Sequence, residues 1–257
     1  MFRHIKFSGL AFLFMAVFTS FAIAAQQDTS VQPASSKFMP PKLIQLSYEV
    51  TKNGQPFAKV HEQFIVTGNT YKLESVTKGI GVYALFGERK LISKGELTSQ
   101  GLKPNHFELH QGDNPQKALF ADFDWPNKIL HMMVKGNLKD ANLIPGAQDL
   151  ASYAYQFMFL PAPLKDAVTM TLTTGKKLNQ YQYKINAEQE VLAIEGTSGT
   201  GTQYKTLHLV QQEQNKPQTE TKELWLATEH YYLPVRILMI DENGAKIEQT
   251  LTELHVE

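Results

Sequence analysis

Hydrophobic and polar residues alternate along most of the chain after residue 43, in short segments that end at turn residues. In 44–50 every second residue is apolar, and the turn Asn53-Gly54 follows. A period of two is typical of a half-buried strand, and Asn-Gly is a strong hairpin signal. The same pattern predicts further strands at 57–66, 71–77, 90–97, 106–110, 118–125, 129–134, 168–173, 178–185, 190–195, 203–211, 221–227, 232–240 and 246–256, with a second hairpin turn at 241–244.

This spacing of strands predicts an all-β fold. Strands that recur about every 8–12 residues are expected of antiparallel sandwiches and barrels. No alternation of strands with helices appears, which argues against a parallel-sheet enzyme scaffold. We expect residues 43–257 to form one antiparallel β domain, either an open or partial β-barrel or two stacked layers.

Two segments interrupt the strand pattern. Residues 148–160 contain no Gly or Pro and stop at Pro161, which predicts a short helix. Residues 79–86 are apolar and punctuated by glycine. Such a segment either plugs the opening of the sheet or forms an exposed contact surface for a membrane or a partner. The plug is favoured, because most apolar residues end up inside.

The N-terminus has the pattern of an export signal. Arg3 and Lys6 precede an apolar run over 7–23, and the small residues Ala22 and Ala24 provide a cleavage step. A transmembrane helix is the competing interpretation, but polar residues dilute the run. We expect a signal peptide at 1–24, cleaved after Ala24, and a flexible tether rich in Gln, Ser, Thr and Pro at 25–42.

Composition limits the compartment and the chemistry. The chain has no cysteine, so disulfides and thiol nucleophiles are excluded. An exported chain without cysteine points to a Gram-negative periplasm, with an extracellular destination as the alternative. The leader contributes two of the 25 basic residues, which leaves 23 basic against 25 acidic residues. This balance gives no electrostatic argument for nucleic acid. No complete glycine-rich phosphate loop is present, and no cofactor is expected.

The sharpest metal candidate is the string His106-x-Glu108-x-His110. On a strand these side chains point to one face, about 7 Å apart from one to the next, which is wide for two ligands of one zinc. The competing interpretation is a solvated strand face with Phe107 and Leu109 turned inward. The solvated face is favoured, and no metal site is predicted.

Two further sets of residues could suggest catalysis. Asp122 and Asp124 share one strand face, but the alternation of the strand explains both. Asp149 and Ser152 could be placed in a hydrolytic triad, yet no Gly-x-Ser-x-Gly elbow exists and helix capping explains them better. The sequence therefore predicts no catalytic residues.

Several short strings lie in a characteristic order along the chain. They are Ser93-x-Gly95, Gly101-Leu102-x-Pro104, Phe123-Asp124-Trp125, Gly146-Ala147-Gln148-Asp149-Leu150-x-Ser152, Tyr155-Gln156, Gly175 with Tyr181, Glu223-Leu224-Trp225-Leu226-Ala227, and Leu233-Pro234-Val235-Arg236-Ile237 with Gly244. Together they resemble the exported bacterial family catalogued as domain of unknown function 3108. The resemblance implies a periplasmic antiparallel β fold, open or partially closed as a barrel, and brings no catalytic residues with it.

The function expected first is non-catalytic binding of an apolar or lipid-like molecule in a cavity between the sheet and the helix. Tyr155, Phe157, Trp225 and Arg236 are the candidate ligand contacts. Arg236 interrupts an apolar strand, and the structural alternative pairs it with an acid such as Glu223 or Asp241.

A second expectation is an envelope scaffold without a small ligand. It would act on an envelope protein, or make peripheral contact with a membrane, through residues 79–86. A hydrolase ranks third, because no convergent nucleophile and base stand out.

Overall fold

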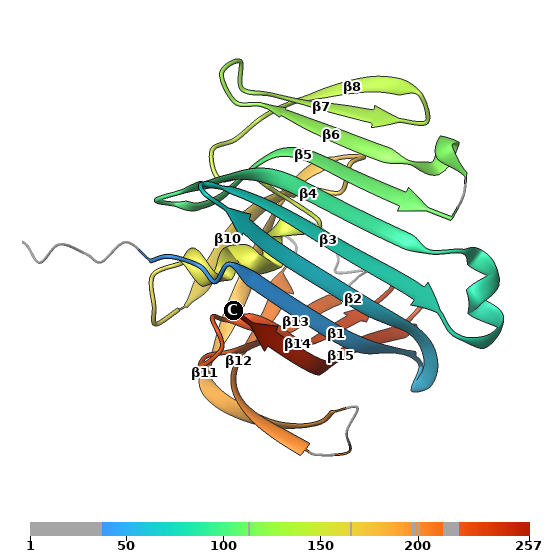
Figure 1. Cartoon of the computed structure of the whole chain (residues 1–257), viewed down its shortest axis with the longest axis vertical. Helices are drawn as coiled ribbons and strands as arrows, with labels where there is room; N and C mark the ends of the chain where they lie inside the picture. Colours follow the sequence, from blue (N-terminus) through green and yellow to red (C-terminus); the bar gives the residue numbers. More distant parts are fainter. Residues whose placement is uncertain (1–37, 113, 165, 197–198, 200, 213–220) are drawn as a thin grey trace, which may run out of the picture. The chain divides into compact units, whose positions relative to one another are not determined.

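Fifteen β-strands dominate the computed structural model, which describes residues 38–112, 114–164, 166–196, 199, 201–212 and 221–257 (Figure 1). The expected leader and most of the expected tether lie outside the described residues. The strands are β1 (Leu43–Lys52), β2 (Gln55–Thr67), β3 (Thr70–Gly79), β4 (Arg89–Thr98), β5 (Gly101–Gln111), β6 (Leu119–Asp124), β7 (Ile129–Val134), β8 (Asn137–Asn142), β9 (Gln148–Asp149), β10 (Ala167–Thr173), β11 (Leu178–Glu195), β12 (Gly201–Gln212), β13 (Thr221–Ala227), β14 (Leu233–Ile240) and β15 (Lys246–Val256), with 3-10 helices η1 (Gly81–Phe86), η2 (Pro115–Lys117) and η3 (Ser152–Phe159).

All the strands belong to one sheet with the order β8-β7-β6-β5-β4-β3-β2-β1-β15-β14-β13-β12-β11-β10-β9. The chain therefore forms two meanders that are joined where β1 pairs antiparallel with β15. Neighbours are antiparallel throughout, except that β9 pairs parallel with β10. The sheet has free edges at β8 and β9, so it is open rather than closed. The predicted all-β, antiparallel, open-barrel class is confirmed.

The sheet curls so that its two halves meet across an apolar interior. Tyr48 on β1 donates a hydrogen bond of 2.9 Å to the carbonyl oxygen of Pro234 on β14. Gly175, after β10, lies against Leu119 and Phe107; a Cβ there would sit 2.9 Å from Leu119 Cβ. Only a residue without a side chain allows this approach, and its φ of +80° also favours glycine.

Helix η3 fills the space between the two halves of the sheet. The Tyr155 ring stacks on Phe64 of β2 at 5.2 Å, and Phe157 meets Tyr183 of β11 edge-on at 6.1 Å. Tyr155 and Phe157 are 1% and 0% exposed. Packing of aromatic rings at these distances is favourable beyond burial alone. η3 is therefore an internal plug rather than a surface helix.

The observed elements differ from the predicted ones in three places. The predicted helix at 148–160 begins as strand β9, because Gln148 and Asp149 pair with Leu172 and Thr173. The predicted strands 178–185 and 190–195 form one strand, β11, with a register shift between Ile185 and Gln189. Strand β8 was not predicted, since the segment 137–142 is polar and almost wholly exposed.

The favoured interpretation of residues 79–86 as a plug is wrong. None of the η1 residues is buried, and Val82, Leu85 and Phe86 are 72%, 88% and 75% exposed. Tyr83 anchors the helix through an edge contact of 4.6 Å with Phe57 of β2. Because η3 already occupies the interior, η1 stays outside, as the second interpretation expected.

The described end of the expected tether packs on the domain. Phe38 meets Phe159 of η3 edge-on at 5.4 Å, and the Lys42 amide donates to the carbonyl oxygen of Glu257 at 2.8 Å. Among the described helices, none is long and apolar enough to cross a membrane.

Candidate ligand site

The segment before η3 is tied to the sheet by a buried carboxylate. Asp149 Oδ1 accepts from the amides of Ala151 and Ser152 at 2.9 and 2.8 Å, and Ser152 Oγ accepts from the Asp149 amide at 3.0 Å. Ser93 of β4 donates to Asp149 Oδ2 at 2.5 Å. Burial raises the pKa of Asp149 to about 6, and these hydrogen bonds oppose the shift. The side chains of Asp149 and Ser152 accept from backbone amides as expected, but in the turn before the helix: the N-cap of η3 is Ala151, and no side chain caps it.

Two glutamine amides fasten η3 and β9 to the start of β5. Gln156 Oε1 accepts from the Leu102 amide at 2.8 Å, and its Nε2 donates to the Gln100 carbonyl oxygen at 2.9 Å. Gln148 Nε2 donates to the Leu102 carbonyl oxygen at 2.9 Å. Gly101 is required here, because a Cβ would lie 2.4 Å from Gln156 Oε1. The sequence strings around 93–104 and 146–156 therefore meet in one structural cluster that holds the plug.

A second buried carboxylate faces the plug. Glu62 on β2 accepts hydrogen bonds of 3.0 Å from Ser75 and from the Tyr155 hydroxyl. Burial raises the pKa of Glu62, while these two hydroxyls lower it. Both interior acids thus serve to position η3.

A pocket of about 280 Å³ lies beside Leu150, two residues before η3 begins. This volume is close to the lower end of the range of about 300–1,000 Å³ for small-molecule sites. Six of the twelve lining residues are aliphatic or aromatic, and the other six are polar or charged. The lining residues are Leu150, Leu172, Thr174, Lys177, Tyr181, Gln211, Thr221, Lys222, Met239, Ile240, Asp241 and Ile247.

Three charged side chains line this pocket, Lys177, Lys222 and Asp241, and Lys222 is the one that contacts a ring of η3. It shares the inward face of β13 with Leu224, and its ammonium lies 4.3 Å from the centroid of the Tyr153 ring. Within the described part of the chain, no carboxylate lies within ion-pair distance of it. Burial lowers the pKa of Lys222; the nearby Tyr183 and Tyr181 raise it, and Arg89 lowers it further. A half-buried cation beside apolar walls can bind an anionic group that enters with an apolar chain.

Trp225 and Arg236 lie on the other face of the sheet. The indole of Trp225 stacks on the His208 ring of β12, with 4.2 Å between the ring centroids. The Arg236 guanidinium carbon on β14 lies 4.5 Å from the centroid of the indole. Its Nε1 donates to Glu190 at 2.7 Å. Trp225 is only 5% exposed, so it is buried by these neighbours. Arg236 pairs with Glu248 at 2.7 Å.

The predicted ion pair of Arg236 is thus present with a different acid. Glu223 instead contacts His208 Nε2 at 2.7 Å. Asp241 accepts from the amides of Asn243 and Ala245 in the β14–β15 turn, at 2.9 Å each. The pairing of β14 with β15 brings Glu248 next to Arg236, and this pairing could not be deduced from the strand alone.

The four predicted ligand contacts do not meet in one site. Tyr155 and Phe157 belong to the plug. Trp225 and Arg236 belong to the stack of side chains on the other face of the sheet, which we call the outer ladder. None of the four lines the pocket. The sequence analysis missed Lys222. One signal could have identified it, because Lys222 shares strand parity with Leu224 and Leu226 and is therefore a lysine on an apolar face.

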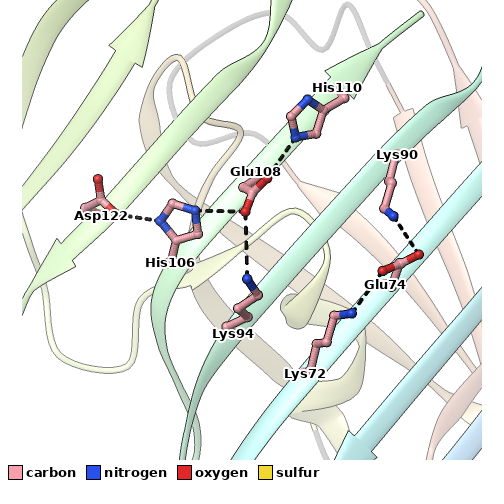
Figure 2. Close-up of polar contacts among 8 residues, drawn as sticks. All are labelled: Lys72, Glu74, Lys90, Lys94, His106, Glu108, His110 and Asp122. Atoms are coloured by element: carbon pink, nitrogen blue, oxygen red, sulfur yellow. Dashed lines mark hydrogen bonds and ion pairs between the residues drawn. The ribbon is translucent and has the colours of Figure 1, made fainter.

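His106, Glu108 and His110 lie on the outer face of β5 (Figure 2). The carboxylate of Glu108 contacts His106 Nε2 at 3.1 Å and His110 Nε2 at 2.8 Å, while His106 Nδ1 contacts Asp122 at 2.5 Å. Both histidines thus turn toward carboxylates, as on a solvated charged face. Nowhere in the described segments do three or more His, Asp or Glu side chains form a group suited to a metal ion.

Asp122 and Asp124 also have structural contacts. Asp122 pairs with His106, and Asp124 accepts from the amide and the side chain of Asn127 at 3.1 and 2.7 Å. Asp124 therefore shapes the β6–β7 turn.

Larger hollows lie on the outer surface. One of about 460 Å³ crosses β1, β2, β3 and β15 and is lined largely by polar side chains, among them His61, Glu74, Glu253 and His255. Pockets that bind small molecules are mostly apolar with few polar groups. The Lys222 pocket matches that description better despite its smaller volume.

Comparison with known proteins places the fold in the class of open, barrel-like β-proteins. A crystal structure from Brucella abortus, described as a beta-barrel-like protein of domain of unknown function DUF1849, matches with a TM-score of 0.53. The match covers 86% of this chain and 100% of that chain at 10% identity, so it shows a shared fold alone. No curated protein matches the sequence. The family model described as protein of unknown function (DUF3108) matches residues 45–252, and the chain belongs to this family.

Proposed function

We propose that this protein is a non-catalytic binding domain of the bacterial periplasm that holds an apolar chain with an anionic end. The observation that carries the proposal is Lys222, a half-buried ammonium that lines the apolar pocket and has the Tyr153 ring as its neighbour. The leader at 1–24 supports the compartment.

The walls of the pocket suit the apolar part of such a ligand. Leu150, Leu172 and Ile247 supply aliphatic surface, and Met239 adds a flexible side chain that adapts to different shapes. The volume of about 280 Å³ is that of one medium-length acyl chain rather than a two-chain lipid.

The contacts of the interior acids support a role without chemistry. Asp149 caps the segment before η3, and Glu62 accepts from Ser75 and Tyr155. A hydrolytic site needs a nucleophile and a base that converge on an open position. These two acids are instead engaged in positioning the plug.

Calorimetric titration with decanoate and with decanol tests the proposal. A hydrogen-bonded ion pair with a half-buried cation is worth about 1.5–3 kcal/mol, so Lys222→Met should weaken decanoate binding about ten- to a hundredfold. Decanol binding should change less than about twofold, because it has no charge to lose. Lys184→Met, at an exposed position of β11, is the control. Equal loss for both probes, or no binding of decanoate, would overturn the proposal.

The exposure of η1 favours a second candidate, an envelope scaffold that acts through residues 79–86. In that case decanoate should not bind, and Leu85→Asp should abolish binding to an envelope protein. Decanoate binding that depends on Lys222 would exclude a scaffold without a small ligand.

A further inference from the structure

One end of the curled sheet gathers connections from both meanders. Because neighbouring strands are antiparallel, this end holds the β1–β2, β3–β4, β7–β8, β10–β11 and β14–β15 connections, the described part of the β5–β6 connection, the end of β12 and the start of β13. In Figure 1, η1 and the β1–β2 turn are seen together at the right. Asn53 and Lys246 exchange two hydrogen bonds of 2.8 Å, which join two of these turns. We call this end the basic rim.

The rim carries an excess of positive charge. Counting each connection with two residues of its flanking strands, the described residues include ten cations and three carboxylates; with residues 113 and 213–220 counted from the sequence, the numbers are eleven and six. At the opposite end, the two described cations Lys42 and Lys128 are outnumbered by five described carboxylates, Asp124, Asp166, Glu195, Glu229 and Glu257. The rim cations are Lys52, Lys78, Arg89, Lys90, Lys117, Lys135, Lys176, Lys177, Lys222 and Lys246, and its carboxylates are Glu88, Asp241 and Glu242.

The apolar helix η1 projects from this rim. Val82, Leu85 and Phe86 are mostly exposed, and Ile80 is 36% exposed. The backbone beneath them is fixed, because Tyr83 packs on Phe57 and the Ile80 amide donates to the Phe57 carbonyl oxygen at 2.9 Å. Gly79 permits the fold-back, since a Cβ there would lie 2.2 Å from the Tyr83 carbonyl oxygen.

The Lys222 pocket is lined from the same end of the sheet. Three of its lining residues belong to the rim: Lys177 in the β10–β11 connection, Lys222 at the start of β13, and Asp241 in the β14–β15 connection. Arg89, which follows η1, is near enough to Lys222 to act on its charge. The apolar helix and the pocket thus share one end of the domain.

We propose that the basic rim docks on an anionic lipid bilayer. Val82, Leu85 and Phe86 insert at the interface, and the Lys222 pocket lies at the membrane-facing end of the domain. Apolar side chains on a basic surface are the features that bind proteins to anionic bilayer surfaces. A protein partner is less well matched, since stable protein interfaces cover about 800 Å² on each side and three or four side chains on η1 supply little of that. Docking on the membrane does not depend on the proposed ligand binding. The orientation of the pocket toward the membrane, in contrast, depends on the docking.

Co-sedimentation of the mature chain with lipid vesicles tests the docking. We expect binding to equimolar phosphatidylcholine and phosphatidylglycerol vesicles, weakening as salt is added, and at least about tenfold weaker binding to pure phosphatidylcholine. Leu85→Asp with Phe86→Asp should reduce binding at least about tenfold, and Lys117→Glu with Lys135→Glu should also weaken it.

Matched controls separate docking from folding and from the pocket. Val191→Asp, at a position 60% exposed on β11, and Lys42→Glu with Lys128→Glu, at the opposite end, should leave vesicle binding within about twofold of the parent. Circular dichroism and thermal melting check that each variant folds. Lys222→Met should lose decanoate binding; it removes one half-buried cation of the ten described on the rim, so it should weaken vesicle binding less than Lys117→Glu with Lys135→Glu does.

Absence of vesicle binding, equal binding to both vesicle types, or binding unaffected by Leu85→Asp with Phe86→Asp would overturn the docking proposal. If decanoate still binds in that case, the proposed function survives alone. Absence of decanoate binding to the parent protein, with vesicle binding intact, would overturn the pocket instead.

Discussion

Ser93 on β4 donates a hydrogen bond of 2.5 Å to Asp149, and both residues are 0% exposed. This contact joins the first meander to the segment that leads into the plug. It also places a carboxylate in the apolar interior without a cation in ion-pair contact among the described residues. The stability of the fold should therefore depend on whether Asp149 carries a proton.

Asp149→Asn should remove part of the pH dependence of stability. The folded-state pKa is about 6 and the ordinary value is 3.8, so between these values the folded protein binds more protons than the unfolded chain. The contribution of Asp149 to the free energy of unfolding therefore falls as pH rises from about 4 to 6, by up to about 3 kcal/mol, and is constant above. Urea unfolding of both proteins across this range measures it. A constant difference between the two would contradict the raised pKa.

Trp225→Ala should cost about 3–5 kcal/mol of unfolding free energy, because the indole is buried and stacks on His208 and Arg236. Val191→Ala, at an exposed position of β11, should change stability by less than about 0.5 kcal/mol. Chemical denaturation of the three proteins gives both values. A loss below about 1 kcal/mol for Trp225→Ala would show that the stack contributes little.

Leu85→Asp should leave the fold intact. The side chain is 88% exposed, so we expect a change within about 0.5 kcal/mol in unfolding free energy. Thermal melting with circular dichroism checks this. An unfolded variant would instead support the plug interpretation and contradict the position of η1.

His106→Ala together with His110→Ala should leave bound metal unchanged. Burial raises the pKa of Glu108, but hydrogen bonds from His110 and His106 outweigh burial and lower it overall. These half-exposed pairs should contribute less than about 1 kcal/mol to stability. Elemental analysis of both purified proteins decides the point. Zinc in the parent that disappears in the variant would restore the metal interpretation.

The strand pattern was readable from the sequence wherever alternation and turn residues coincided. Asn53 and Gly54 both adopt positive φ, 51° and 78°, as their hairpin signal predicts. Strand β8 was not predicted, because a polar edge strand has no buried face and therefore shows no alternation of hydrophobic and polar residues. The 3-10 geometry of η3 and the pairing of β9 depend on distant strands, which local periodicity does not report.

The candidate site was not predictable from the sequence. A cavity between the sheet and the helix was expected, but no η3 residue lines the observed pocket, which Leu150 reaches from the segment before η3. The four ligand contacts were predicted from residue type alone. Residue type cannot separate a ligand contact from a structural role, because aromatic residues also pack in the plug and in the outer ladder. The curl of the sheet decides which inward side chains remain uncovered, and it leaves Lys222 at the pocket.

Native mass spectrometry of residues 25–257, purified without detergent, tests the central claim most directly when parent and Lys222→Met proteins are compared. The account predicts a lipid-sized adduct, or an adduct formed on adding decanoate, in the parent and its loss in the variant. A bare mass for both proteins in the presence of decanoate would contradict it.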